Sequence, residues 1–188
     1  MNFGAGTGAA VGKLLGMDYC MKTWIGYYCV KLGNLIVGAI VALNSLRDIF
    51  DWKTGEKIAG LLDENKENFL STYEELFKSS AEVDNRFVEN ATIAVVFTNV
   101  EFDKTKLCKI ANMAPNGYAR SIRPVHTSAD GDTIYAVSIG NIKADIDAVG
   151  ILALWVISEA IISAVNNAES GYGYPAAKDL NNYDIYKG

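Results

Sequence analysis

A glycine-rich stretch near the start of the chain is the first segment whose residue types suggest chemistry. The string "GAGTGAAVGK", residues 4–13, has glycines and a lysine of the kind with which a loop cradles a phosphate group. A Walker phosphate loop is excluded, because Thr7 stands where its first glycine belongs and Leu14 replaces the Ser or Thr that binds magnesium. A dinucleotide-binding loop is also excluded, since Ala9 replaces its third glycine. The segment is interpreted as a tight backbone turn that brings Lys13 close to a polar group.

Histidine and cysteine are too sparse for the common metal sites. His126 is the single histidine, and the three cysteines form no CxxC pair. No metal and no other cofactor are therefore expected. A Ser-His-Asp triad through Asp130 or Asp132 is formally open, but the chain has no GxSxG nucleophile elbow. His126 is expected to be a histidine hydrogen-bonded in a loop.

Two carboxylates near this histidine are more specific. In "RPVHTSADGDT", residues 123–133, Asp130 and Asp132 flank a glycine directly before a strand-like run. Two carboxylates on one turn can project toward a shared site. An ordinary Asp-Gly turn explains the same string. From the residues alone, both interpretations stay open.

The overall composition limits the class of partner. The chain has 188 residues, half of them hydrophobic, which is enough to bury a core as one domain. A net charge of −5 and a pI near 4.9 argue against a nucleic-acid groove or an anionic membrane surface, which need clustered Lys and Arg. An odd number of unpaired cysteines is typical of reduced thiols, so a cytoplasmic protein is expected. Small molecules or proteins are the favoured partners, with no nucleic acid and no membrane.

Two apolar runs approach the length of a membrane span. Lys31, Gly33 and Asn34 interrupt residues 24–46, so two strands joined by a Gly-Asn turn are predicted there. Residues 146–165 follow an acidic start and contain one glutamate. They are predicted to form a helix buried between layers or in a subunit interface.

The remaining segments alternate between helix and strand patterns. Asp103 is a candidate helix start, and Pro115 is expected to kink or end the same helix. The predicted elements are, in chain order, a helix over residues 65–78, an exposed linker over 79–90, a strand over 91–97, a helix over 103–119 and a strand over 132–140. This order favours helices packed outside stacked sheets, which is a layered α/β sandwich.

Several long strings together resemble one known family. They are "GAGTGAAVGKLLG", "VGAIVALNSLRDIFDWKTGEKIAG" and "NATIAVVFTNVEFDKTKLCKIANMAPNGYARSIRPVHTSADGDTIYAVSIG", in this order and at compatible spacing over nearly the whole chain. They resemble the self-processing family of L-aminopeptidase D-amidase/esterases, β-peptidyl aminopeptidases and nylon-oligomer hydrolases. The resemblance implies a four-layer αββα sandwich of the N-terminal-nucleophile hydrolase type, made as a precursor that cuts itself before a Ser or Thr.

The resemblance puts the cut between Asn90 and residue 91. In such a precursor the hydroxyl after the cut attacks the preceding carbonyl, and the α-amine that is freed then serves as general base. The chain is then a single domain, in which residues 1–78 resemble the C-terminal part of the family's α chain and residues 91–188 resemble its β chain. The linker over 79–90 ends at the self-cleavage site.

Four more residues carry over roles from the family. Asn44 resembles the amide that binds the oxyanion, and Lys13 resembles the lysine that helps to orient the site. Asp130 and Asp132 resemble the acidic pair that supports the nucleophile. The implied substrate is a small peptide or amide, no cofactor is implied, and a homo-oligomer is expected.

One departure from the family concerns the nucleophile itself. Residue 91 is Ala91, where the family carries Thr or Ser. Thr92 is next in line, but successive strand residues point to opposite faces, so Thr92 is not expected to take over. The chain is therefore expected to stay uncut and inactive, with Ala91 either a natural loss or a substitution that traps the precursor.

A second departure concerns the start of the chain. The resemblance implies a segment before the glycine loop that this sequence lacks, so the chain is naturally short, has been shortened, or receives that part from another chain. A missing sheet portion exposes strand edges and favours self-association. The alternative function is a homologue without a nucleophile, kept as a self-assembling structural protein or as a binder of small amides.

Overall fold

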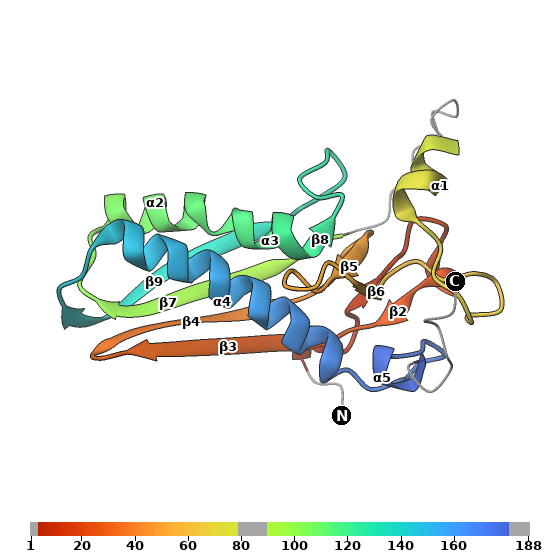
Figure 1. Cartoon of the computed structure of the whole chain (residues 1–188), viewed down its shortest axis with the longest axis horizontal. Helices are drawn as coiled ribbons and strands as arrows, with labels where there is room; N and C mark the ends of the chain where they lie inside the picture. Colours follow the sequence, from red (N-terminus) through yellow and green to blue (C-terminus); the bar gives the residue numbers. More distant parts are fainter. Residues whose placement is uncertain (1–3, 79–89, 181–188) are drawn as a thin grey trace.

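The structure, a computed structural model, describes residues 4–78 and 90–180. Its largest element is a mixed four-stranded sheet with the strand order β3-β4-β7-β9 (Figure 1). Strand β4 is antiparallel to both of its neighbours, β3 and β7, and β9 is parallel to β7. The four strands are β3 (Ile25–Leu32), β4 (Leu35–Ala42), β7 (Ile93–Val100) and β9 (Thr133–Ile142).

Strands β3 and β4 form the predicted hairpin. Leu32 pairs with Leu35, and the two residues between them are Gly33 and Asn34. Gly33 has a φ of 59°, a left-handed conformation that glycine adopts without the steric penalty of a Cβ. The prediction of two strands over residues 24–46 is confirmed.

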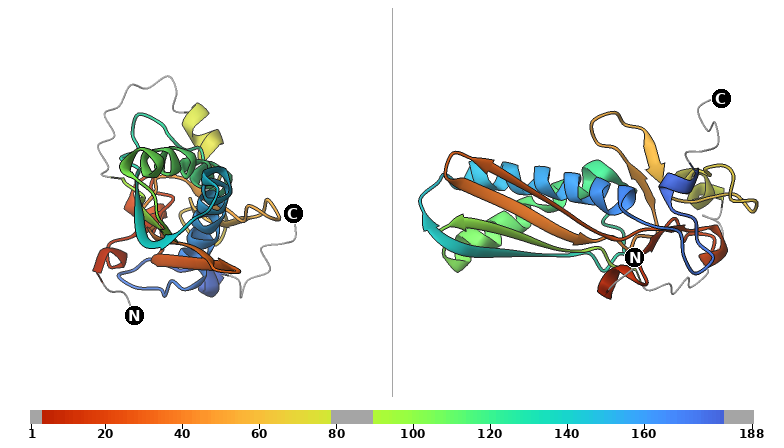
Figure 2. Two further views of the ribbon diagram at one scale, coloured as in Figure 1. Left: turned by 90° about the vertical axis from the view of Figure 1, so that its left-hand side faces the viewer. Right: turned by 90° about the horizontal axis from the view of Figure 1, so that it is seen from below.

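Three helices lie on one side of this sheet. They are α2 (Lys104–Met113), α3 (Pro115–Ser121) and α4 (Ile146–Asn166). The end-on view in Figure 2 shows α2 and α4 side by side over the same face of the curved sheet. Asp103 caps α2 by accepting a hydrogen bond from the Lys106 amide at 2.8 Å, and Pro115 begins α3. The helix predicted over residues 103–119 is thus confirmed in place and is broken at Ala114.

Helix α4 is the core helix of the protein. It is long and apolar enough to cross a membrane, but 67% of its most apolar window is buried inside the protein. Asp145 caps it, as its acidic start indicated, by accepting hydrogen bonds from two backbone amides at 3.0 Å. At Gly26 of β3 an added Cβ would lie 1.8 Å from the Ala160 carbonyl oxygen, so helix and strand touch backbone to backbone.

Smaller elements gather at one end of the main sheet (Figure 1). A two-stranded sheet and a three-stranded sheet of order β6-β5-β8 lie there, with short helices around them. Their bounds are β1 (Ala10–Val11), β2 (Met21–Lys22), β5 (Asp48–Phe50), β6 (Lys57–Ala59), β8 (Ile122–Arg123), α1 (Thr72–Lys78), α5 (Ala177–Leu180) and the 3-10 helices Gly4–Gly6 and Met17–Tyr19.

The helix predicted over residues 65–78 is wrong in its first boundary. Helix α1 begins only at Thr72, because Ser71 accepts a hydrogen bond from the Glu74 amide and so acts as a cap inside the predicted helix. Phe77, near the end of this helix, is 71% exposed. The linker predicted over 79–90 falls largely outside the described residues, and Asn90, its last residue, is buried.

The two faces of the main sheet have different surroundings. The inner face packs on the helices, and its residues Val37, Ala39, Val41, Ala94 and Val96 are at most 1% exposed. The outer face is turned away from them, and it exposes Tyr27, Ile40, Ile93, Tyr135, Val137 and Ile139 to between 38% and 70%. The mixed α/β class is confirmed, and the described residues supply one helix layer and one main sheet of the four layers expected.

Candidate active site

A pocket of about 590 Å³ opens where β4 ends and β7 begins. One wall is the glycine-rich segment, and another is the chain entering β7. The pocket is lined by Ala5, Gly8, Ala9, Ala42, Asn44, Asn90, Ala91, Ile93 and Ala129. The residues on either side of the predicted cut and the predicted oxyanion amide thus line the same cavity.

The Asn90 carbonyl is held by a backbone donor. The Gly131 amide donates a hydrogen bond to the Asn90 oxygen at 3.0 Å. A Cβ at Gly131 would lie 3.1 Å from that oxygen and 3.4 Å from the Ala91 Cβ, so only glycine allows so close an approach without adjustment. The arrangement polarises the carbonyl that precedes Ala91.

Ala91 and Thr92 point in different directions. Ala91 and Ile93 line the pocket, whereas Thr92 is fully buried and is not among the residues that line it. The Thr92 carbonyl accepts a hydrogen bond from the Tyr118 hydroxyl of α3 at 3.1 Å. The alternation expected of a strand therefore holds, and the Thr92 side chain does not face the pocket.

Asn44 is oriented by two donors behind the pocket. Its Oδ1 accepts hydrogen bonds from the Lys13 ammonium at 2.7 Å and from the Ala10 amide at 3.3 Å. Both partners are donors, so the side-chain oxygen must face them. The Asn44 NH₂ is left as the donor available to a group in the pocket. The prediction that Lys13 lies close to a polar group is confirmed, but the segment before it forms a 3-10 helix and strand β1 instead of one tight turn.

Lys13 is almost completely buried, with 3% of its surface exposed. Burial lowers its pKa to about 8, because an ammonium loses solvation in the interior, while the nearby Cys20 opposes the shift. The lysine is therefore mostly charged at neutral pH, but it is close to its titration range.

The two predicted aspartates have different partners. Asp132 accepts a hydrogen bond from the Thr92 amide at 2.8 Å, one residue beyond Ala91. Asp130 instead accepts from the amide and the hydroxyl of Thr127 at 2.8 and 2.9 Å, which closes a turn. Burial raises the pKa of Asp132 and the Asp130 charge raises it further, while the Thr92 hydrogen bond, His126 and Arg47 act in the opposite direction.

Arg47 is a buried charge that sequence reasoning missed. It is 3% exposed, and its Nη2 donates to the Thr127 hydroxyl at 2.8 Å, which in turn donates to Asp130. Burial lowers the pKa of Arg47, and Asp130 is the largest of the opposing charges. Its Nε has no hydrogen-bond partner among the described residues. The sequence offered one signal for this role, an arginine three residues after Asn44 and directly before Asp48 at the start of β5.

His126 lies in a loop with a left-handed backbone, φ 59°, and its ring lies 6.4 Å from the Tyr118 ring. A position in a loop was expected of this residue. Within the ranges that the structure describes, no group of three or more His, Cys, Asp or Glu side chains is arranged to hold a metal ion.

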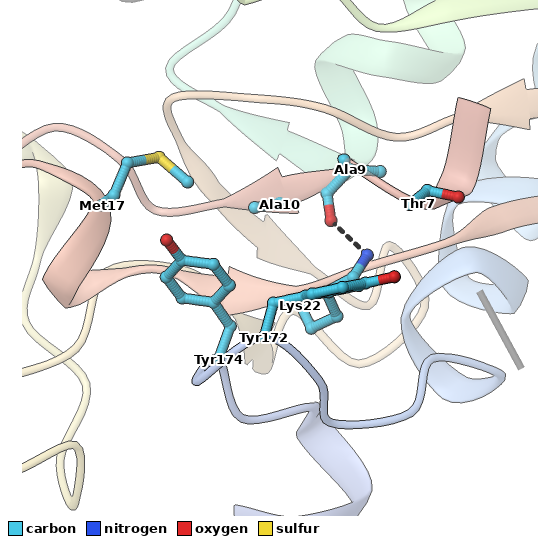
Figure 3. A pocket seen from close by; sticks show the side chains of 8 residues that line it. Thr7, Ala9, Ala10, Met17, Lys22, Tyr172 and Tyr174 are labelled. Atoms are coloured by element: carbon cyan, nitrogen blue, oxygen red, sulfur yellow. Dashed lines mark hydrogen bonds between the residues drawn. The ribbon is translucent and has the colours of Figure 1, made fainter. Parts of the chain in front are cut away.

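A second pocket, of about 240 Å³, shares the wall formed by Gly8 and Ala9 (Figure 3). Lys22 reaches into this region, but its ammonium donates to three carbonyl oxygens, those of Gly6, Ala9 and Thr23, at 2.7 to 2.8 Å. All three donors of the ammonium are thereby used. Lys22 fixes the shape of the glycine-rich wall, a role that no sequence motif indicates.

Comparison with known proteins gives a consistent result. The sequence pattern of peptidase family S58 matches residues 2–178. An uncharacterized aminopeptidase of Mycobacterium leprae is 32% identical over 190 residues, covering 92% of this chain and 50% of that protein. A 6-aminohexanoate-oligomer endohydrolase of an Agromyces species is 28% identical over 177 residues, covering 86% and 49%.

Solved structures show the same fold at lower identity. The L-aminopeptidase D-Ala-esterase/amidase of Ochrobactrum anthropi, described as a variant of the Ntn hydrolase fold, matches with a TM-score of 0.58 at 18% identity, over 93% of this chain and 46% of that one. The PH0078 protein of Pyrococcus horikoshii matches with a TM-score of 0.59 at 18% identity, over 97% and 50%. The chain spans about half the length of the relatives that it matches.

Proposed function

The chain belongs to peptidase family S58, a family of aminopeptidases and amidohydrolases, and we propose that it is a self-cleaving hydrolase precursor for small peptides or amides that Ala91 holds uncut and inactive. The observation that carries this proposal is the Asn90 carbonyl, polarised by the Gly131 amide at 3.0 Å and followed by a residue that faces the pocket. A threonine or serine at position 91 would carry its hydroxyl on Cβ, next to the Asn90 carbonyl that it must attack.

The self-cleavage step follows from this placement. With threonine at position 91, its Oγ attacks the Asn90 carbonyl carbon, and the Gly131 amide stabilises the oxyanion that forms. The C–N bond then breaks, the hydroxyl proton passes to the nitrogen, and an ester remains. Water hydrolyses the ester to the Asn90 carboxylate and a free hydroxyl. The new α-amine of residue 91 is then the base for later turnovers.

Asn44 and Lys13 act on the substrate side of the pocket. The Asn44 NH₂ faces the cavity and donates to the oxyanion of a bound amide, because its oxygen is occupied by Lys13 and Ala10. Lys13 does not line the pocket and acts as a positioning residue, which fixes the orientation of the Asn44 amide.

Asp132 and Asp130 have separate roles in this proposal. Asp132 anchors the strand start through the Thr92 amide and holds a negative charge near the new α-amine. Asp130 closes the turn with Thr127, which Arg47 supports from the interior. The acidic pair therefore consists of one residue beside the cut and one that shapes the loop carrying Gly131.

A second candidate function is binding without hydrolysis. The pocket is already open in the uncut chain and is lined by Asn44. Small amides would then be retained by hydrogen bonds without being cleaved. Calorimetry with short peptides and amides tests this possibility, and an absence of heat with the folded protein would exclude it for that panel.

The proposal is tested by intact mass spectrometry of three proteins. Ala91→Thr restores the hydroxyl, whereas Ala91→Val has nearly the same shape without it. We expect Ala91→Thr alone to yield fragments of residues 1–90 and 91–188, while the original chain and Ala91→Val stay whole. A folded Ala91→Thr protein that stays whole would contradict the proposal. Adding Asp132→Asn to Ala91→Thr keeps an oxygen for the Thr92 amide and removes the charge, so cleavage is expected to slow at least tenfold.

A further inference from the structure

The second pocket, of about 240 Å³, has a lining that the proposed cleavage does not use. Its large side chains are Met17, Tyr172 and Tyr174, and we call it the tyrosine pocket. Figure 3 shows both tyrosines beneath the strand that carries Ala10, with Met17 toward one end of the pocket and Thr7 toward the other. Tyr172 is 70% exposed and Met17 is 41% exposed. These side chains therefore present apolar surface that a ligand in the pocket would bury.

Tyr172 occupies a backbone position that suits glycine or asparagine. Gly171 and Tyr174 exchange two backbone hydrogen bonds, at 3.0 and 3.1 Å, and so close a two-residue hairpin. Both residues between them have a left-handed φ, 57° at Tyr172 and 83° at Gly173. Turns of this kind favour Asn-Gly or Gly-Gly, because a bulky side chain is strained at such a φ. The turn itself has no need of a tyrosine, which points to a use for the ring.

The hairpin is fastened to two other segments. The Lys66 ammonium donates a hydrogen bond to the Gly173 carbonyl oxygen at 3.0 Å. The Lys22 amide donates to the Pro175 carbonyl oxygen at 2.8 Å, just after the hairpin. The backbone that carries both tyrosines is thus held in place before a ligand arrives, which lowers the entropic cost of binding.

The lining disfavours a charged ligand. Lys22 is the one charged side chain among the eight described residues that line the tyrosine pocket, and its ammonium already donates to three carbonyl oxygens. An anion therefore finds no unused donor on it. A cation would be repelled by this ammonium and by that of Lys66, which lies 5.9 Å from the centre of the Tyr174 ring. A neutral group suits the pocket.

The size and chemistry of the tyrosine pocket favour an aromatic group. An apolar cavity of about 150 Å³ is enough to hold benzene, so 240 Å³ has room for a phenyl ring and part of its chain. Aromatic rings attract one another in offset or edge-to-face contacts, and a methionine sulfur makes favourable contacts with a ring. An aliphatic group would gain only from the burial of apolar surface.

Gly8 joins the tyrosine pocket to the cavity beside Ala91. Gly8 and Ala9 line both of them. A Cβ added at Gly8 would meet no atom of the described residues within 4 Å, and the φ of Gly8 is not left-handed. Neither packing nor backbone conformation requires glycine there, so the space beside it is open. A ligand with its amide beside Ala91 therefore has a path across Gly8.

We propose that the tyrosine pocket binds an uncharged aromatic side chain of the peptide or amide whose scissile bond lies beside Ala91. The main chain of the ligand crosses Gly8, and its ring contacts Met17, Tyr172 and Tyr174. This inference rests on the proposed function and adds a substrate class to it, which is short peptides that carry an aromatic residue.

Calorimetry on the full, uncut chain tests the pocket. The probes are glycyl-phenylalaninamide and phenylalanyl-glycinamide, their two leucine counterparts, and glycyl-glycinamide. We expect the better phenylalanine peptide to bind roughly tenfold more tightly than glycyl-glycinamide, and more tightly than its leucine counterpart. Equal affinities for the phenylalanine peptides and glycyl-glycinamide, or no measurable binding, would overturn the inference. Self-cleavage of Ala91→Thr needs no added substrate, so it decides the proposed function separately.

Tyr172→Asn separates the ring from the fold. It removes the aromatic group and introduces a residue that left-handed turns favour, so the urea midpoint should not fall. Affinity for the better phenylalanine peptide should fall about fivefold, while affinity for glycyl-glycinamide stays the same. Tyr27→Asn is the matched control, because Tyr27 is 69% exposed on β3 and lines neither pocket, and it should change neither affinity. A Tyr172→Asn protein that keeps its full preference for phenylalanine would contradict the inference.

Gly8→Val tests the path between the two pockets. The new side chain fills the open space beside Gly8 without straining the backbone. Affinity for the better phenylalanine peptide should fall about fivefold. Phenol needs no path across Gly8, so saturation-transfer NMR should still detect its binding. An unchanged preference for the phenylalanine peptide would mean that the pockets act separately, and the inference would be wrong.

Discussion

The two faces of the main sheet carry similar side chains and have opposite surroundings. On the inner face, Val41 and Val96 are at most 1% exposed under α4, whereas on the outer face Ile40 and Tyr135 are 48% and 58% exposed. The strands are apolar on both sides, a pattern typical of a sheet covered on both faces. The strands are therefore suited to two covering layers, of which the described residues supply one.

Two glycines, one on each face, give the sharpest test of this difference. Gly26→Ala should destabilise the protein by about 3 kcal/mol or more, because the new Cβ would lie 1.8 Å from a carbonyl oxygen and 2.4 Å from an amide nitrogen of α4, and a whole helix must move. Gly38→Ala meets only the tip of the Phe97 ring, which can swing into the open side. Its loss should be about 1 kcal/mol or less.

Urea unfolding of both variants at low protein concentration measures these effects. Dilution keeps the outer face free of any partner, so the Phe97 ring has room to move. Equal losses for Gly26→Ala and Gly38→Ala would mean that the outer face is as tightly packed as the inner one, and the comparison would fail.

Local signals in the sequence were enough to predict the boundaries of the β3–β4 hairpin and of the helices α2 and α3. The Gly33-Asn34 turn, the Asp103 cap and Pro115 each determine a boundary through the geometry of one or two residues. A boundary of this kind depends on residues that are adjacent in the sequence, so it can be predicted without knowledge of the fold.

Features that depend on distant residues were not predictable in the same way. The ammonium of Lys22 finds three carbonyls from the glycine-rich segment and its own strand end, and Arg47 meets Thr127, 80 positions away. Asp130 and Asp132 were singled out as a pair, but only the folded loop reveals that they take different partners. Which face of the sheet is covered was equally hidden, because both faces read as apolar.

The pocket end of the sheet differs from the rest of the outer face because charge is buried there. The folded chain holds the pKa of Lys13 at about 8, below the ordinary 10.5, so between these values the unfolded chain binds a proton that the folded chain lacks. The free energy of unfolding should therefore rise with pH across this window, by on the order of 3 kcal/mol at most. Lys13→Met should make this rise smaller, since Lys22 and Lys57, whose pKa values burial also lowers, still contribute to it, and urea unfolding at pH 7.5 and pH 10 measures the difference. An unchanged pH slope in Lys13→Met would mean that Lys13 is well solvated.

The smallest effect is expected at Ile139, and its dependence on protein concentration makes it informative. Ile139 is 70% exposed, so Ile139→Ala removes little buried surface from a single chain, and the loss in free energy of unfolding should be about 0.5 kcal/mol or less. If a second copy covers the outer face, the same side chain becomes buried as the protein associates. Association stabilises the folded state by mass action, so the urea midpoint of the original chain should rise with concentration and that of Ile139→Ala should rise less.

Ile151→Ala is the control, because it removes an isoleucine from α4 that is also more than half exposed, and its midpoint should follow the original chain at every concentration. Parallel curves for all three proteins would mean that the outer face stays in water. A difference in urea midpoint that grows with concentration for Ile139→Ala alone would mean that association buries the outer face, as the helices bury the inner one.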